Sequence, residues 1–172
     1  MVSIKKVNES FTTMTEMVMP NDTNPLHNLM GGNLMKWMDI VAAVCAGKHC
    51  ESHVVTASVD NISFRQPIPI GHVVTMTASV TRAFSTSVEV YVEVFSADIK
   101  GGNSRKSNDA YLTFVGVDDA DLKPIPVPQV LPLTEAEQQR YNSALRRREL
   151  RLILSGRMKP DDSVELKALF QS

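Results

Sequence analysis

The chain has 172 residues, of which 43% are apolar, and its 18 Lys and Arg side chains stand against 19 Asp and Glu for a formal net charge of -1. This length and apolar content predict one ordinary hydrophobic core and exclude a wholly disordered chain. The near balance of charge excludes a strongly basic nucleic-acid binder. The longest central apolar run, residues 40–46, is far shorter than the roughly 20 residues of a membrane span, so we expect no membrane partner.

The amino-terminal residues and the cysteines both indicate the cellular compartment in which we expect the protein. After Lys5 and Lys6, polar side chains occupy the positions where a secretory signal needs an apolar stretch. The two cysteines, Cys45 and Cys50, diverge around one helix and lie too far apart for a disulfide if that helix forms. We therefore expect a cytoplasmic chain with reduced thiols.

In chain order, the hydrophobic pattern predicts a strand at 11–19, a helix at 31–50 and strands at 54–64, 73–83, 88–95 and 108–117. The clearest strand alternates Val88, Val90, Val92 and Val94 with other residues, and residues 84–87 before it suit a tight hairpin. The helix at 31–50 is apolar nearly all round, which predicts that it is buried. The pattern therefore indicates an α+β fold in which an antiparallel sheet covers a long helix.

The carboxyl-terminal third has a different composition. Four prolines between Lys123 and Pro132 favour an extended path strapped along the surface. Thr134 and Glu137 form the pattern of a capping box, which predicts a peripheral helix. We expect a folded domain at 1–120, a Pro-rich linker at 121–133 and a basic helical tail at 134–172.

Asp39 is one of only two charged residues between Gly31 and Gly47, the other being Lys36. A buried carboxylate without a partner costs several kcal/mol, so its presence in an apolar helix needs an explanation. One explanation is an ion pair with Lys36, three residues earlier. The other is that Asp39 lines a cleft as a general base or nucleophile.

The segment that leads into this helix offers hydrogen-bond donors. Gly31 and Gly32 at the helix start present amides without intrahelical acceptors, which suit a carbonyl oxygen that becomes an oxyanion. Asn24 on the entering loop is either a turn residue or an amide that binds water or a substrate carbonyl. The helical rise places Asp39 about 10 Å from the glycine amides. A shared site would therefore need a curved cleft or a carboxylate from a second protomer.

Other polar clusters carry weaker signals. Cys45, His49, Cys50 and His53 lack the paired spacing of zinc sites, so we predict no metal. The arginine-rich tail is interrupted by acid and poor in aromatic residues, which favours a solvated helix face over an RNA site. Two basic residues in a loop, Arg105 and Lys106, could bind phosphates or simply aid solubility.

The sequence resembles the hotdog-fold acyl-CoA thioesterases, which include brain cytosolic acyl-CoA hydrolases and bacterial short-chain enzymes. The resemblance covers residues 9–140 and is carried by TNPLHNLMGG at 23–32, LMKWMD at 34–39, VVTASVDNISF at 54–64, PIPIG at 67–71 and PIPVPQVLP at 124–132. It implies a hotdog fold, with a long central helix wrapped by an antiparallel sheet. It also implies a dimer with sites at the interface, and a trimer of dimers as in many relatives.

The resemblance implies hydrolysis of acyl-CoA to fatty acid and coenzyme A without cofactor or metal. Asn24 and Asp39 match the family's catalytic pair, supplied by different protomers, and the Gly32 amide, beside Gly31, would polarise the thioester carbonyl. Coenzyme A would lie on the outer surface near six residues, Ser85, Thr86, Ser87, Arg105, Lys106 and Asn108.

The sequence departs from the family at three positions. Relatives usually have glycine at His27, an aromatic residue or histidine at Met30, and glutamate at Ile40. A histidine can adopt a left-handed backbone at modest cost. The alternatives are an enoyl-CoA hydratase or dehydratase that uses His27, and a non-catalytic acyl-CoA-binding regulator.

Overall fold

A computed structural model of the chain describes residues 3–60, 62, 64 and 66–170. Its strands and α-helices, in order, are β1 (Ile4–Lys6), β2 (Thr12–Met17), α1 (Gly31–Cys50), β3 (His53–Asp60), β4 (Val73–Ala83), β5 (Ser87–Ala97), β6 (Arg105–Val117), β7 (Gln129–Leu131), α2 (Glu135–Leu154) and α3 (Glu165–Phe170). The chain forms two compact units, the first ending at Leu131 and the second beginning at Pro132.

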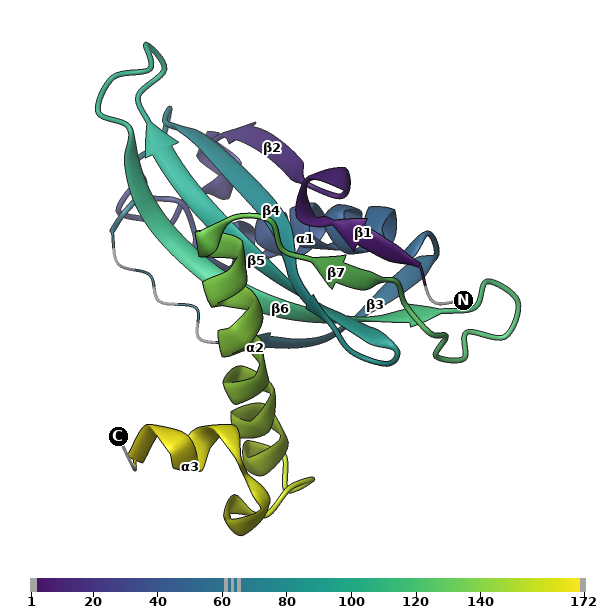
Figure 1. Ribbon diagram of the computed structural model, residues 1–172. Helices are drawn as coiled ribbons and strands as arrows, with labels where there is room; N and C mark the ends of the chain where they lie inside the picture. Colours follow the sequence, from purple (N-terminus) through teal and green to yellow (C-terminus); the bar gives the residue numbers. More distant parts are fainter. Residues whose placement is uncertain (1–2, 61, 63, 65, 171–172) are drawn as a thin grey trace. The chain divides into compact units, whose positions relative to one another are not determined.

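The first unit is a five-stranded antiparallel sheet in the order β2-β4-β5-β6-β3. The sheet curls around α1, which contacts all five strands (Figure 1). The hotdog architecture expected from the resemblance is confirmed. In this sheet β2 and β3 are the edge strands, and β3 pairs with β6 alone among the described strands.

The helix α1 has the bounds that its apolar pattern predicts, Gly31–Cys50. Nine of its residues are buried: Leu34, Trp37, Met38, Val41, Ala42, Cys45, Ala46, His49 and Cys50. The helix ends where Glu51 adopts a left-handed backbone with φ 54°. One face of α1 is buried from Leu34 to Cys50, whereas Met35, Ile40 and Val44 are exposed, so the prediction of a helix buried nearly all round is only partly correct. The buried face makes α1 a rigid support for the side chains that it carries.

The central strands agree with the sequence pattern, and the edge strands are shorter than predicted. β4 has the predicted bounds, and the Phe84 amide donates to the Ser87 carbonyl at 2.8 Å in the predicted hairpin. The predicted strand 11–19 spans only Thr12–Met17. β3 ends at Asp60 rather than at residue 64, although residues 61 and 63 lie outside the described part of the chain.

The Pro-rich segment is bound to the first unit. Its amides at Ile125 and Val127 donate to the carbonyls of Gly116 and Ser85, at 2.9 and 3.2 Å. The segment then forms β7, which pairs in parallel with β1. This small second sheet has no counterpart in the sequence prediction.

The second unit consists of α2, α3 and the short connection between them. Thr134 accepts from the Glu137 amide at 3.2 Å and Glu137 accepts from the Thr134 amide at 3.0 Å, which confirms the capping box. The Glu149 carboxylate accepts from three amides at the start of α3, those of Val164, Glu165 and Leu166.

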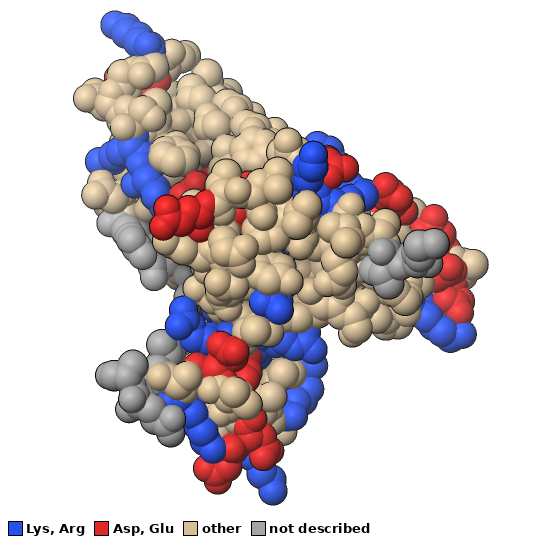
Figure 2. All heavy atoms as spheres, in the orientation of Figure 1, with Lys and Arg blue, Asp and Glu red and all other residues tan. Residues whose placement is uncertain are grey.

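Neither the charge distribution of the visible face nor the described helices indicate a nucleic-acid or membrane partner. Figure 2 shows acidic side chains interspersed among the basic ones on the visible face of the second unit, so that face has no continuous basic surface for nucleic acid. None of the described helices combines the length and the hydropathy that a membrane crossing requires.

Candidate active site

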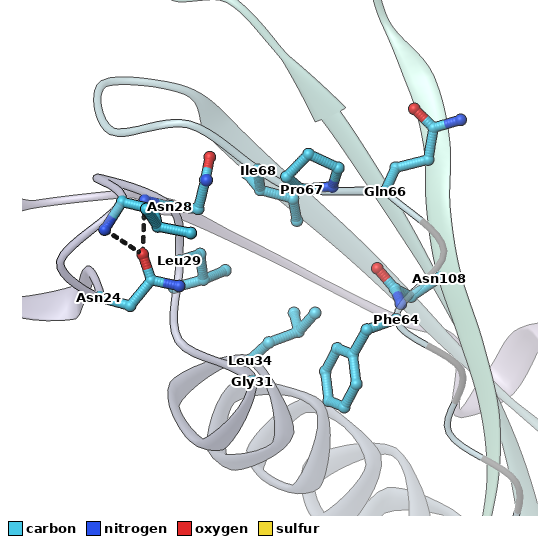
Figure 3. Close-up of a pocket in the computed structure, with 11 residues that line it drawn as sticks. Asn24, Asn28, Leu29, Gly31, Leu34, Phe64, Gln66, Pro67, Ile68 and Asn108 are labelled. Carbon is cyan, nitrogen blue, oxygen red and sulfur yellow. Dashed lines mark hydrogen bonds between the residues drawn. The ribbon is translucent and has the colours of Figure 1, made fainter.

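A pocket of about 420 Å³ lies beside the start of α1 (Figure 3). Four of its lining residues carry carboxamides, Asn24, Asn28, Gln66 and Asn108, and the carboxamide of Gln66 points away from the pocket. Apolar side chains, among them Leu29, Leu34, Phe64 and Ile68, form much of the remaining wall. Such a pocket suits a mainly apolar ligand that presents one or two polar atoms.

Asn24 is a turn residue, one of the two roles that its sequence context left open. Its Oδ1 accepts from the amides of Leu26 and Asn28, at 2.9 and 3.2 Å, which closes the loop into a tight turn. Its amide nitrogen points the other way, toward Leu29 and the pocket (Figure 3). With Oδ1 occupied, Asn24 faces a ligand as a hydrogen-bond donor.

His27 in the same loop has a left-handed backbone, with φ 56°. This is the backbone conformation that the resemblance led us to expect at His27. The backbone is held there because the His27 amide donates to the Asn24 carbonyl and the His27 carbonyl accepts from the Ile70 amide, both at 2.9 Å. A histidine in this region costs about 1 kcal/mol relative to its preferred conformations.

Replacing His27 by Gly is therefore expected to raise the free energy of unfolding by about 1 kcal/mol, because glycine adopts this conformation without strain. Urea denaturation checks this result, which should appear as a higher midpoint with an unchanged slope. Leu26→Gly is the matched control, since the neighbouring Leu26 is exposed and lacks a positive φ; it should lower stability. Equal or lower stability of the His27 variant would contradict the strain argument.

The start of α1 presents uncapped amides beside the pocket. The Met30 side chain makes no capping hydrogen bond. The amides of Asn33 and Leu34 both donate to the Met30 carbonyl, at 3.0 and 3.1 Å. The amides of Gly31 and Gly32 have no acceptor in the described part of the chain. These N–H groups and the helix dipole together favour a developing negative charge.

The two glycines serve different purposes. A Cβ at Gly31 would lie 3.0 Å from the Phe64 ring, so the absence of a side chain there allows the ring to pack over the helix start. A Cβ at Gly32 would meet nothing within 4 Å. The Gly32 backbone is therefore open to a bound molecule.

Asp39 is half-buried on α1, two turns beyond the glycines. Its Oδ1 accepts a hydrogen bond from the Thr56 hydroxyl on β3 at 2.9 Å. No ion pair with Lys36 occurs among the described side chains, so that explanation of Asp39 is wrong. Among the described side chains, the donor that orients this carboxyl group is therefore the neutral hydroxyl of Thr56.

Thr56 was missed by the sequence analysis. The pairing of β3 with β6 shifts register between Thr56 and Ser58, which marks a β-bulge. A bulge bends the strand and redirects a side chain, here so that the Thr56 hydroxyl reaches α1. Threonine is an ordinary strand residue, and no pattern in the sequence singles it out.

Asn24 and Asp39 do not face one pocket within a single chain. Asn24 lines the pocket at the helix start, whereas Asp39 lies beside the free edge of β3 and is absent from the pocket wall. The same region exposes Val55 and Val59 on β3 and Ile40 and Val44 on α1, each 41–50% accessible. A free strand edge flanked by apolar side chains is typical of a surface that pairs with another chain.

The residues expected to contact coenzyme A do not form one cluster. Ser87 pairs with Val115 and Ser96 pairs with Arg105, so Ser85, Thr86 and Ser87 lie at the opposite end of β5 from Arg105 (Figure 1). Asn108 is buried in the pocket wall.

The two basic residues of this group are already engaged in local contacts. Arg105 donates to the Pro67 carbonyl at 3.0 Å. Lys106 pairs with Glu93 and Asp109, at 3.0 and 2.7 Å. Although burial opposes it, hydrogen bonds to Asp109, Tyr91 and Glu93 raise the pKa of Lys106.

The cysteines and His49 are poor candidates for chemistry. Burial raises the pKa of Cys45 to about 12 and that of Cys50 to about 11, so neither is a thiolate nucleophile near neutral pH. Burial also lowers the pKa of His49, whose Nε2 donates to the Pro128 carbonyl at 2.9 Å. Within the described residues, no three His, Cys, Asp or Glu side chains are grouped to hold a metal.

Comparison with known proteins identifies the family to which this chain is similar. Residues 26–102 match the thioesterase superfamily. YkhA of Bacillus subtilis, named as an uncharacterised acyl-CoA thioester hydrolase, is 38% identical over 139 residues, which cover 81% of this chain and 80% of that protein.

Two solved structures are closely similar. An apo hexameric acyl-CoA thioesterase has a TM-score of 0.85 and 38% identity over 90% of this chain and 98% of that one. An acyl-CoA hydrolase of Staphylococcus aureus, solved with butyryl coenzyme A, coenzyme A and coenzyme A disulfide, has a TM-score of 0.82 and 37% identity, covering 89% and 94% of the two chains. It has also been solved as alanine variants of an aspartate, a threonine and an asparagine.

These relatives support hydrolysis over hydration or simple binding. The match in sequence and fold extends over most of both chains, and the range that matches the superfamily, 26–102, includes Asp39 and Thr56. The protein is an acyl-CoA thioester hydrolase and belongs to the thioesterase superfamily.

Proposed function

We propose that Asp39 is the catalytic carboxylate of this hydrolase, and that Asn24 and Gly32 of a second protomer bind the thioester beside it. The observation that carries the proposal is the hydrogen bond from the Thr56 hydroxyl to Asp39 at 2.9 Å, which orients a carboxyl group that has no ion-pair partner among the described residues. A positioned carboxylate can take a proton from water or attack a carbonyl carbon.

Both versions of the chemistry balance without a cofactor or metal. As a general base, Asp39 takes a proton from water while the water oxygen bonds to the carbonyl carbon; the carbon–sulfur bond then breaks, and the proton returns from Asp39 to the sulfur to release coenzyme A as the thiol. As a nucleophile, Asp39 forms a mixed anhydride and expels the thiolate, and water then cleaves the anhydride to give the free acid. The carboxylate is regenerated in either case.

The donors for the carbonyl oxygen come from the start of α1 and the loop before it. The Gly32 backbone is open, the Gly31 backbone beside it lines the pocket, and the amide nitrogen of Asn24 points into that pocket. Donors that are already in place when charge develops on the oxygen lower the barrier by several kcal/mol.

Sharing the site between two copies resolves the separation within one chain. Asp39 and Thr56 lie beside the exposed edge of β3, where an antiparallel pairing with a second β3 would continue the sheet. That pairing would bring Asp39 of one copy toward the pocket of the other. The hexameric relative supports a trimer of such dimers.

The variants of the Staphylococcus aureus hydrolase add an independent argument. The asparagine, aspartate and threonine replaced there occur in the same order and at the same separations as Asn24, Asp39 and Thr56 here. We infer that Thr56 is the positioning residue for Asp39. Of the residues expected to contact coenzyme A, we retain Arg105 as the phosphate ligand, because its exposed guanidinium keeps further donors beyond the bond to Pro67.

Replacing Thr56 by Val is expected to lower kcat by about 10- to 100-fold, since a hydrogen bond to a charged group contributes about 1.5–3 kcal/mol. Valine suits a strand, so the fold should persist. The measurement is thiol release from acyl-CoA at saturating substrate. Thr56→Ser keeps the hydroxyl and should restore most of the rate; a serine variant as slow as the valine variant would show that the hydroxyl is not what matters.

A further inference from the structure

Asn108 occupies an unusual place in the pocket wall. It lies on β6 and is only 2% exposed, yet it lines the pocket. Figure 3 shows Asn108 and Asn24 on different sides of the pocket, with Leu29 and Leu34 between them. An acyl chain that enters beside Asn24 would therefore pass apolar side chains before it reaches the buried amide of Asn108.

The wall around Asn108 is held in place by hydrogen bonds. The Ser107 hydroxyl donates to the Asn108 Oδ1 at 2.5 Å. The segment across from it is tied to β6 by the bond from Arg105 to the Pro67 carbonyl, and to the entering loop by the Leu29 amide, which donates to the Ile68 carbonyl at 2.8 Å. A pocket with fixed walls discriminates by size and polarity, because it cannot reshape around each ligand.

We propose that Asn108 determines acyl-group specificity by ending the acyl pocket with a polar wall. The inference rests on the proposed function, which places the thioester beside Asn24 and Gly32. A short acyl group ends among the leucines, whereas a longer alkyl chain must place its methylenes against a polar amide that hydrogen bonds hold in place. The enzyme therefore favours acyl chains that stop before Asn108 over chains that reach it.

The test compares kcat/KM for a series of straight-chain acyl-CoA substrates, from acetyl to dodecanoyl, in the wild type and in Asn108→Leu. Leucine is close to asparagine in size and removes the amide. We expect the octanoyl-to-butyryl ratio of kcat/KM to rise by about 10-fold or more, the range of discrimination that pocket methylenes provide. The same replacement at Asn142, an exposed residue of the second unit, should leave the ratio unchanged. An unchanged ratio in folded Asn108→Leu would overturn the proposal.

The wild type gives a second test that does not depend on a variant folding. Its kcat/KM should fall by about 10-fold or more between butyryl-CoA and octanoyl-CoA, and equal or better use of octanoyl-CoA would overturn the proposal. Failure of the catalytic assignment is distinguishable, since Asp39→Asn would then keep its turnover. Loss of turnover in Asp39→Asn together with an unchanged chain-length ratio in Asn108→Leu would refute only the specificity role.

Discussion

Asp39→Asn is expected to lower kcat/KM for acyl-CoA hydrolysis by about 100- to 10,000-fold, the contribution typical of a positioned general base. Asparagine keeps the size of the side chain and can still accept the hydrogen bond from Thr56. It cannot take a proton from water, and it is not a nucleophile. The loss should therefore appear in the rate of thiol release while coenzyme A binding, measured by calorimetry, remains near that of the wild type.

Asp119→Asn is the matched control for this experiment. Asp119 is an exposed aspartate that bonds a single side chain, His53, at 2.6 Å, as Asp39 bonds Thr56. Its replacement removes the same charge at a distance from the pocket and should leave turnover intact. If the Asp39 variant retained a rate within a few-fold of the wild type, the carboxylate would not be the catalytic group.

Two inactive variants are expected to complement one another if the site is shared. Asn24→Ala and Asp39→Asn, each inactive alone, should regain about one quarter of wild-type activity when they are co-expressed in equal amounts, because half of the dimers are mixed and each mixed dimer has one intact site. The measurement is thiol release from the purified mixture. The rates of thiol release by the two variants expressed separately are the baseline for comparison.

The alternative geometry predicts a different result. If Asn24 and Asp39 of the same chain formed each site through a curved cleft, every site in the mixture would still carry one defect. No activity would then return, whatever the proportion of mixed dimers. Recovery therefore separates the two arrangements that the sequence alone left open.

The most regular parts of the fold were predictable because their signals are local. α1 and β4 have the predicted bounds, since a helix that is apolar all round and a long run rich in valine and threonine are unambiguous patterns. β5 and β6 extend beyond the predicted residues, because pairing between neighbours adds polar residues at their ends. β1 and β7 are three residues each and exist only through a pairing of distant segments.

The residues of the candidate site also divide into those that a local sequence pattern indicates and those that it does not. Asn24, Gly31 and Asp39 could be selected from residue type and context, because an acid in an apolar helix and paired glycines at its start are visible in the sequence. Thr56 depends on a bulge, and Asn108 on the wall that its strand presents after folding. Neither property belongs to a local pattern, so only the folded chain reveals them.

The parallel pairing of β1 with β7 places both ends of the first unit in one small sheet, with Lys6 beside Leu131. Because the two strands are parallel, a linker from Leu131 to Ile4 must also run back along β1, so it has to be a crossover connection rather than a tight turn. Such a unit is suited to circular permutation, and to repetition along a single polypeptide, since either change would leave the sheet around α1 intact. Two hotdog units fused in this way could supply both halves of a shared site from one gene.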